Sequence, residues 1–174
     1  MRRASPGRPA LHCSEMKKFG AWFVLLSLAV LAGCSGIRLI SDYDEATDRS
    51  LTAIQHKTDD FIEALKKTAN TDAAAFDRHL RFYEDIDRDL RQLEFRVGSI
   101  PDNDRTIRLV TDIRAVILGE GRCTEEERSL RALHCLPENK FKGPSPKVLQ
   151  ISQRNINQTI SAALKLELAK KHGR

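Results

Sequence analysis

The feature that most constrains the fold is the spacing of apolar residues after position 40, which recur every three or four positions. Such a spacing keeps side chains on one face of an α-helix, whereas a β-strand would alternate at every second residue. The pattern predicts two long helices, each of about 25 residues or roughly 38 Å. The first carries Tyr43, Thr47, Leu51, Ile54, Thr58, Phe61 or Ile62, and Leu65; the second carries Phe76, Leu80, Tyr83, Ile86, Leu90, Leu93 and Val97.

Capping residues set the expected bounds of the first two helices. Ser41, with Asp44 three residues later, is expected to cap the first helix. The run Asn70–Asp72 predicts a break, after which the second helix continues to Gly98 and ends before Pro101.

The second half of the chain predicts further helices. A shorter helix is expected after Asp102–Asp104, fading at Gly119. Thr124–Glu127 reads as a capping box that opens a short helix through Arg131. Residues 136–145 read as a loop, and Ser145 followed by Pro146 predicts the start of a last helix that frays near Lys170.

These elements predict an all-α fold, an antiparallel up-and-down bundle of about four helices over residues 41–172. Short connections favour antiparallel neighbours within one chain. A coiled coil between chains is the alternative, because the second helix comes close to heptad spacing over three repeats. Both arrangements bury the same residues.

The charge is unevenly distributed along the chain. Without residues 1–33 the chain has 24 lysines and arginines against 23 acids, although residues 136–174 alone carry eight bases and two acids. The basic last helix is expected to pack against an acidic body, and a surface for lipid headgroups is the other interpretation. Near-neutrality and expected export argue against nucleic acid as a partner.

The N-terminal segment has the form of a signal peptide. Lys17 and Lys18 precede an apolar run of about 14 residues, which is the length of a signal-peptide core and shorter than the roughly 20 needed to span a bilayer. Residues 16–33 are therefore predicted to be the signal, with an uncleaved anchor as the alternative. Residues 1–15 are interpreted as a disordered leader ahead of the true start at Met16.

The run ends in Leu31-Ala32-Gly33-Cys34, which resembles the lipobox of bacterial lipoproteins. The resemblance implies cleavage before Cys34, a diacylglyceryl thioether on its sulfur and a further acyl chain, such as palmitate, on its amine. Two or more acyl chains hold a protein on a bilayer essentially permanently. Ser35, by the same resemblance, implies the outer membrane facing the periplasm, with residues 34–40 as the tether.

Residues 40–57 resemble a group of small uncharacterised lipoproteins of Gram-negative bacteria. That group has no established activity, so Cys34 is the one functional residue that the resemblance assigns. Its lipid-bearing role implies the membrane as a partner.

Cys123 and Cys135 are the two cysteines left after the leader and the lipobox, in a compartment that permits disulfides. One bridge between them is expected, and it would contribute on the order of 3 kcal/mol in the chain-entropy model. A metal site of Cys123, His134 and Cys135 is the alternative, although it lacks a fourth ligand and the usual paired spacing.

The sequence contains none of the spacings that mark a catalytic, cofactor or metal site. We therefore expect a protein that is not an enzyme and needs no cofactor: a membrane-anchored envelope lipoprotein with a helical binding or structural module and a protein partner. The alternative is an envelope enzyme or small-ligand binder with its site near the Cys123–Cys135 loop.

Overall fold

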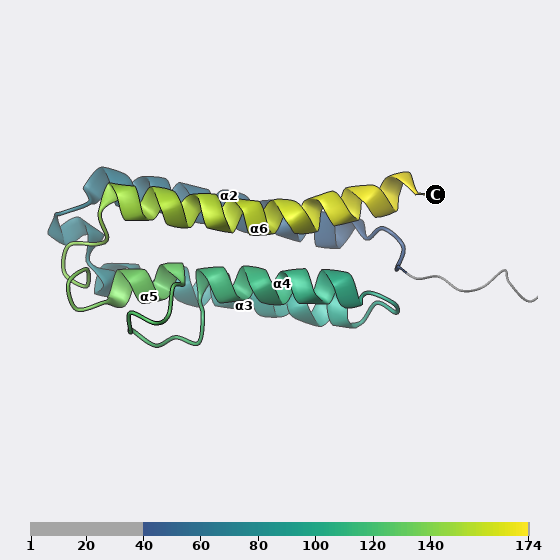
Figure 1. The fold of residues 1–174 in the computed structure, drawn as a ribbon, viewed down its shortest axis with the longest axis horizontal. Coiled ribbons are helices and arrows are strands. Elements are labelled where there is room, and N and C mark those ends of the chain that lie inside the picture. Colours follow the sequence, from purple (N-terminus) through teal and green to yellow (C-terminus); the bar gives the residue numbers. More distant parts are fainter. Residues whose placement is uncertain (1–39, 174) are drawn as a thin grey trace, which may run out of the picture. The chain divides into compact units, whose positions relative to one another are not determined.

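The computed structural model describes residues 40–173, and in this part of the chain every regular element is a helix. Four long helices are joined by short turns and by one irregular segment that contains a fifth, short helix (Figure 1). The elements are α2 (Glu45–Thr68), the 3₁₀ turns η1 (Asp72–Ala74) and η2 (Phe76–His79), α3 (Leu80–Gly98), α4 (Asp104–Ile117), α5 (Leu130–Cys135) and α6 (Pro146–His172).

The four long helices form a closed, antiparallel arrangement. Helix α2 packs against α3 and α6, and α4 packs against the same two helices from the other side. Figure 1 shows the α2–α3 and α5–α6 connections at one end of the bundle, and the α3–α4 connection and the C-terminus at the other. The predicted all-α, up-and-down bundle is confirmed, and the apolar faces are covered within the chain itself.

Most of the core is made of the apolar residues that the spacing identified, but Leu80 of the predicted stripe is 41 % exposed, and Leu130 and Leu149 are buried although the spacing did not identify them. Burying a large aliphatic side chain contributes about 1.5–3 kcal/mol, so such a stripe stabilises each helix mainly through its neighbours. The largest fully buried side chains are Leu51, Ile62, Leu65, Ile86, Leu90, Leu93, Ile113, Ile117, Leu130, Leu149, Ile156 and Ile160.

The first helix begins later than expected, because Asp44 and not Ser41 is its N-cap. The Asp44 carboxylate accepts a hydrogen bond from the Thr47 backbone N–H at 2.9 Å. The same carboxylate accepts two hydrogen bonds from Arg96 of α3, at 2.7 and 2.5 Å. Hydrogen bonding from Arg96 holds the pKa of Asp44 well below its ordinary value, with smaller contributions from Thr47. Asp44 therefore ties the start of α2 to the end of α3.

The second predicted helix is shorter than expected, since residues 72–79 form two 3₁₀ turns before α3. Asn70 adopts a left-handed backbone, with φ of 67°, which ends α2. The Phe76 N–H then donates to the Lys140 carbonyl at 2.8 Å instead of to a carbonyl of its own helix. A long-range backbone hydrogen bond thus overrides the helical pattern of the local sequence.

The short helix predicted to open at Thr124 is also displaced. It is α5, which begins at Leu130 with Ser129 as its N-cap. The Ser129 hydroxyl accepts from the Ala132 N–H at 3.1 Å. The Glu127 carboxylate does not complete a capping box, because it accepts from the backbone of Gly121 and Arg122.

The remaining predictions agree with the structure. Helix α4 has the expected bounds, and α6 begins at Pro146 with Ser145 as its cap, although it continues to His172. Within residues 40–173, no helix combines the length and apolar character needed to cross a bilayer. The predicted leader, the signal at 16–33 and the lipidation site Cys34 lie outside the described residues, as does the tether except for Ile40.

Candidate functional site

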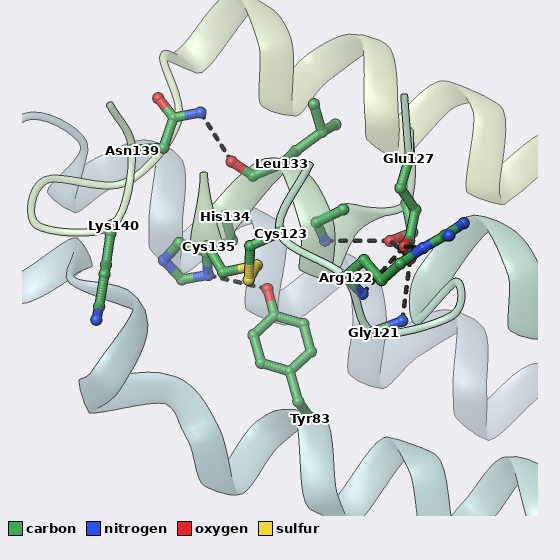
Figure 2. Close-up of a disulfide and its surroundings, with 12 residues drawn as sticks. Tyr83, Gly121, Arg122, Cys123, Glu127, Leu133, His134, Cys135, Asn139 and Lys140 are labelled. Carbon is green, nitrogen blue, oxygen red and sulfur yellow. Dashed lines mark hydrogen bonds and ion pairs between the residues drawn. A yellow bond between two sulfur atoms is a disulfide. The ribbon is translucent and has the colours of Figure 1, made fainter. Parts of the chain in front are cut away.

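The predicted disulfide between Cys123 and Cys135 is present, with the two Cα atoms 5.4 Å apart. Cys135 lies on α5 and is buried, whereas Cys123 lies in the preceding loop and is exposed. The bridge fastens an irregular segment to a helix that belongs to the core (Figure 2). It is the centre of the least regular part of the bundle.

Glu127 closes the same loop from within. Its carboxylate accepts hydrogen bonds from the Gly121 N–H at 3.1 Å and from the Arg122 N–H at 3.0 Å (Figure 2). Burial acts to raise the pKa of Glu127, but these backbone donors outweigh it and hold the pKa below its ordinary value. The carboxylate is thus committed to holding the loop.

His134, next to Cys135 on α5, forms a buried chain of hydrogen bonds. Its Nε2 lies 2.8 Å from the Ala74 carbonyl, and its Nδ1 lies 2.9 Å from the Tyr83 hydroxyl on α3. Because a carbonyl can only accept, Nε2 carries the proton and Nδ1 accepts from Tyr83. Figure 2 shows Tyr83 pointing across the bundle toward this ring. Both ring nitrogens are therefore engaged.

Burial sets the ionisation of this pair. The pKa of His134 is lowered to about 4, mainly by desolvation and to a smaller extent by His79 nearby, while the hydrogen bond to Ala74 opposes both. Burial likewise raises the pKa of Tyr83 well above its ordinary value. Both side chains are consequently neutral at pH 7. The pair connects α3, α5 and η1, and both side chains are buried.

Aromatic rings pack around the histidine. Phe76 meets the His134 ring edge to face, with centroids 5.3 Å apart, and Phe61 stacks on Phe82 with centroids 3.6 Å apart. His79 lies 5.7 Å from His134. This packing makes His134 part of the core, since edge-to-face pairs add to the stability gained from burial.

The alternative metal site is not assembled. His134 directs both nitrogens at other partners, and the two sulfurs are joined to each other. Among the described residues, no group of three or more histidines, cysteines or acids is placed to hold a metal ion.

The loop over residues 136–145 is fastened to the α2–α3 connection. The Lys140 carbonyl accepts from the Phe76 N–H at 2.8 Å, and the Lys142 carbonyl accepts from the Asn70 N–H at 2.9 Å. Asn139 donates from its side chain to the Leu133 carbonyl at 2.7 Å (Figure 2). The loop therefore has a defined conformation at the end of the bundle.

A second buried polar group, which the sequence did not predict, lies at the other end. The Lys170 ammonium donates to Glu167 at 2.6 Å and to Asn103 and Thr106, each at 2.8 Å. Thr106 also donates to the Glu167 carboxylate at 2.9 Å. A signal was present: positions 167 and 170 continue the helical stripe of Ile156, Ile160 and Ala163, so charged residues there point into the core.

Ser41 joins the chain that precedes α2 to this network. Its hydroxyl donates to the Asn103 side chain at 2.8 Å, and its N–H donates to the Asp102 carbonyl at 3.0 Å. The residue predicted to cap the first helix is thus held by the α3–α4 turn. The described chain enters the bundle at a fixed point.

An open concavity lies elsewhere, along the outer face of α6. The residues that line it are polar or charged and come from one helix: Gln150, Gln153, Arg154, Asn157, Gln158, Ser161 and Lys165. Gln153 and Asn157 also donate to Asp59 of α2, at 2.9 and 2.8 Å, which forms a polar seam between the two helices. None of these residues belongs to the Cys123–Cys135 loop.

The enclosed titratable groups are suited to structural roles. His134, Tyr83 and the Glu167–Lys170 pair have perturbed or paired side chains, yet each is buried and hydrogen-bonded inside the bundle. Perturbed groups mark catalysis when they line a cleft, and these do not line the α6 concavity. Comparison of the chain with protein-family models, curated proteins and solved structures found no match.

Proposed function

We propose that the protein is a membrane-anchored lipoprotein of the bacterial envelope, with a non-enzymatic helical module that binds a partner protein or serves a structural role. The anchor is the acylated Cys34, and the expected location is the outer membrane, facing the periplasm. The proposal combines the lipobox resemblance with the geometry of the bundle.

The observation that carries the proposal is the fixed entry of the chain at Ser41. Ser41 follows Cys34 by seven positions and is held by Asn103 and Asp102. Seven extended residues span at most about 25 Å. Acyl chains on Cys34 would therefore keep this end of the bundle within that distance of a bilayer.

The long helices determine how far the module can extend. Helix α6 has 27 residues, and at 1.5 Å per residue it extends about 40 Å. A rigid rod of that length on a short tether is suited to spacing, docking or bridging within the envelope. The enclosure of His134, Tyr83 and Glu167 supports a non-catalytic role for these groups.

The alternative ligand site at the Cys123–Cys135 loop receives no comparable support. Two of the titratable side chains there are used internally: Glu127 holds the loop and His134 binds Tyr83 and Ala74.

The first test is intact mass spectrometry of the protein purified from membranes of a Gram-negative host. The expected mass is that of residues 34–174 plus acyl chains, and Cys34→Ala is expected to lose the acyl chains and remain unprocessed. An unmodified wild-type chain that retains residues 16–33 would contradict the anchor. Density-gradient separation of the two membranes then tests the outer-membrane location.

The protein-binding part of the proposal needs a separate test. A photoreactive residue placed at Gln158, on the open face of α6, is expected to give a discrete crosslinked product in living cells. The same residue at Phe95 of α3 is the comparison site, since that side chain is 82 % exposed. Identical products at both sites would indicate random collision and argue against a specific partner on the α6 face.

A further inference from the structure

An exposed aromatic ring stands at the end of the bundle that is far from Ser41. Phe141 is 67 % exposed, although large apolar side chains are usually placed inside. The carbonyls of Lys140 and Lys142 on either side of it accept hydrogen bonds from Phe76 and Asn70. The backbone is therefore fixed while the ring points outward. We call Lys140, Phe141 and Lys142 the tip.

The elements beneath the tip hold it in place. His134 donates to the Ala74 carbonyl, and Ala74 in turn packs against Gly143, where an added Cβ would lie 2.7 Å from the Ala74 Cβ. The disulfide at Cys135 fastens the helix that carries His134. The buried tyrosine–histidine chain and the disulfide thus support a loop whose prominent feature is one exposed ring. A pre-formed loop loses little conformational entropy when it binds.

The end of the bundle that bears the tip is basic. Residues 66–81 and 136–147 together hold seven lysines and arginines against three acids. At the opposite end, residues 40–49, 96–105 and 165–173 hold six against seven. Lys142 is exposed, and the Lys140 ammonium lies 6.0 Å from the Phe141 ring and 4.0 Å from the exposed Asp77 carboxylate. The positive charge is thus concentrated around the exposed ring.

We propose that the tip is a second membrane contact, at which Phe141 enters the interface of an anionic bilayer and Lys140 and Lys142 lie among its phosphate headgroups. Aromatic rings beside lysines are the composition of membrane-interface anchors, in which the ring is buried and the ammonium stays at the headgroups. The centres of protein–protein interfaces are instead depleted in lysine. A convex tip also needs no complementary pocket in a fluid bilayer.

The acyl anchor explains how one ring can suffice. A single aromatic and two lysines bind a bilayer weakly on their own, but a tether raises the local concentration of the second contact to the millimolar range. In this respect the inference rests on the proposed anchoring at Cys34. The contact would make the bundle lie along the membrane instead of standing on its tether.

The experiment places a fluorescent reporter at the tip. Trp22 is the single tryptophan of the chain, so Trp22→Phe combined with Phe141→Trp leaves one reporter at the tip. The acylated protein is reconstituted into phosphatidylcholine vesicles with or without about one-third phosphatidylglycerol. We expect the emission of the tip tryptophan to shift to shorter wavelength, and to be quenched by brominated lipid, only with phosphatidylglycerol.

Three further variants test whether the position of the reporter and the charge of the tip matter. Phe95→Trp places the reporter at a more exposed position, on α3 between Glu94 and Arg96, and its emission is expected not to change with phosphatidylglycerol. Lys140→Ser with Lys142→Ser is expected to abolish the shift at the tip. Lys165→Ser with Lys171→Ser removes the same charge from exposed positions of α6 and is expected to preserve it.

The outcomes separate the two proposals. If the intact mass shows acyl chains but the tip tryptophan is unaffected by either vesicle, the second contact is wrong and the anchor stands. The second contact is also wrong if the shift is equal in neutral and anionic vesicles, or if the α6 variant abolishes it. If the chain proves unacylated, the same vesicles are added to the free protein, and a phosphatidylglycerol-dependent shift would establish the tip contact without the anchor.

Discussion

The Lys170 ammonium and the Glu167 carboxylate lie 2.6 Å apart, with side chains only 3 % and 1 % exposed. They are neighbours on α6, one turn apart, and they share Thr106 of α4 as a hydrogen-bond partner. Charged groups are rarely buried to this degree, and removing one partner leaves the other uncompensated. This pair fixes how the end of α6 meets the α3–α4 turn.

Replacing Lys170 with methionine is therefore expected to lower the free energy of unfolding by about 3–5 kcal/mol, measured by urea denaturation at pH 7. The combined change Glu167→Met and Lys170→Met is expected to cost less than Lys170→Met alone, because no unpaired charge remains. The control is Arg49→Ala, which breaks the exposed Glu45–Arg49 pair of α2 and is expected to cost about 0.5 kcal/mol or less. Equal losses for Lys170→Met and Arg49→Ala would contradict the role of burial.

The lowered pKa of His134 predicts that the stability of the fold depends on pH between pH 6.5 and 4. Burial lowers its folded-state pKa to about 4 from the ordinary value of 6.5, so the unfolded state binds the proton more readily. The contribution of neutral His134 is complete above pH 6.5 and is lost as the pH falls toward 4. A shift of this size corresponds to about 3 kcal/mol.

The measurement compares urea unfolding of the wild type and His134→Gln at several pH values. Glutamine does not titrate, and its amide can both donate and accept. We expect the difference in unfolding free energy between the two proteins to shrink as the pH is lowered from 7 to 4. A difference that is constant over that range would show that His134 does not titrate with the stated pKa.

Reduction of the Cys123–Cys135 bridge should destabilise the bundle without unfolding it at room temperature. Closing a loop of this size contributes on the order of 3 kcal/mol, mainly by restricting the unfolded chain. We expect Cys123→Ala with Cys135→Ala to retain the helical circular dichroism spectrum and to unfold at a lower temperature. The unfolding temperature of this double variant should not change with dithiothreitol, whereas that of the wild type should fall. A wild-type unfolding temperature that does not change with dithiothreitol would argue against the bridge.

Gly143 is expected to be intolerant of alanine. Its φ is 71°, and an added Cβ would lie 2.7 Å from the Ala74 Cβ and 3.0 Å from the Ala74 carbonyl oxygen. A strained backbone of this kind costs of order 1–3 kcal/mol in addition to the collision. Thermal unfolding of Gly143→Ala should therefore show a clear loss of stability.

Gly98 is the matched control, because it ends α3 with no atom within 4 Å of an added Cβ. Gly98→Ala is expected to be neutral or to stabilise the protein by up to about 1 kcal/mol, since alanine restricts the unfolded chain. If both alanine variants behaved alike, the contact between the loop and the α2–α3 connection would not matter to stability.

Most of the fold follows from features that act locally in the sequence. A stripe such as Ile86, Leu90, Leu93 and Val97 can be buried only by a helix, and the pairing of Cys123 with Cys135 follows from a count of cysteines. The start of α3 could not be placed in this way, because the hydrogen bond from Phe76 to Lys140 joins segments 64 positions apart. Local propensity carries no information about such a partner.

Among the buried polar sites, too, some features can be inferred from the local sequence and others depend on contacts between distant segments. Glu167 and Lys170 fall in register with the apolar stripe of α6, so their burial could have been inferred from the sequence. The pairing of Tyr83 with His134 could not, since it depends on how α3 and α5 meet across the bundle. The cap at Asp44 was missed because Ser41, an equally good cap by type, is drawn away by Asn103.

The adjacency of α2 and α6 has a consequence for synthesis, because ribosomes make a chain from its N-terminus. Helix α2 is complete about eighty residues before α6 begins, and the faces of α2 and α4 that α6 covers lie bare throughout that interval. The bundle of residues 40–173 can close only after α6, the last of its helices, has been translated. A nonsense codon before α6 would leave a chain that has the other helices but lacks the one that covers α2 and α4.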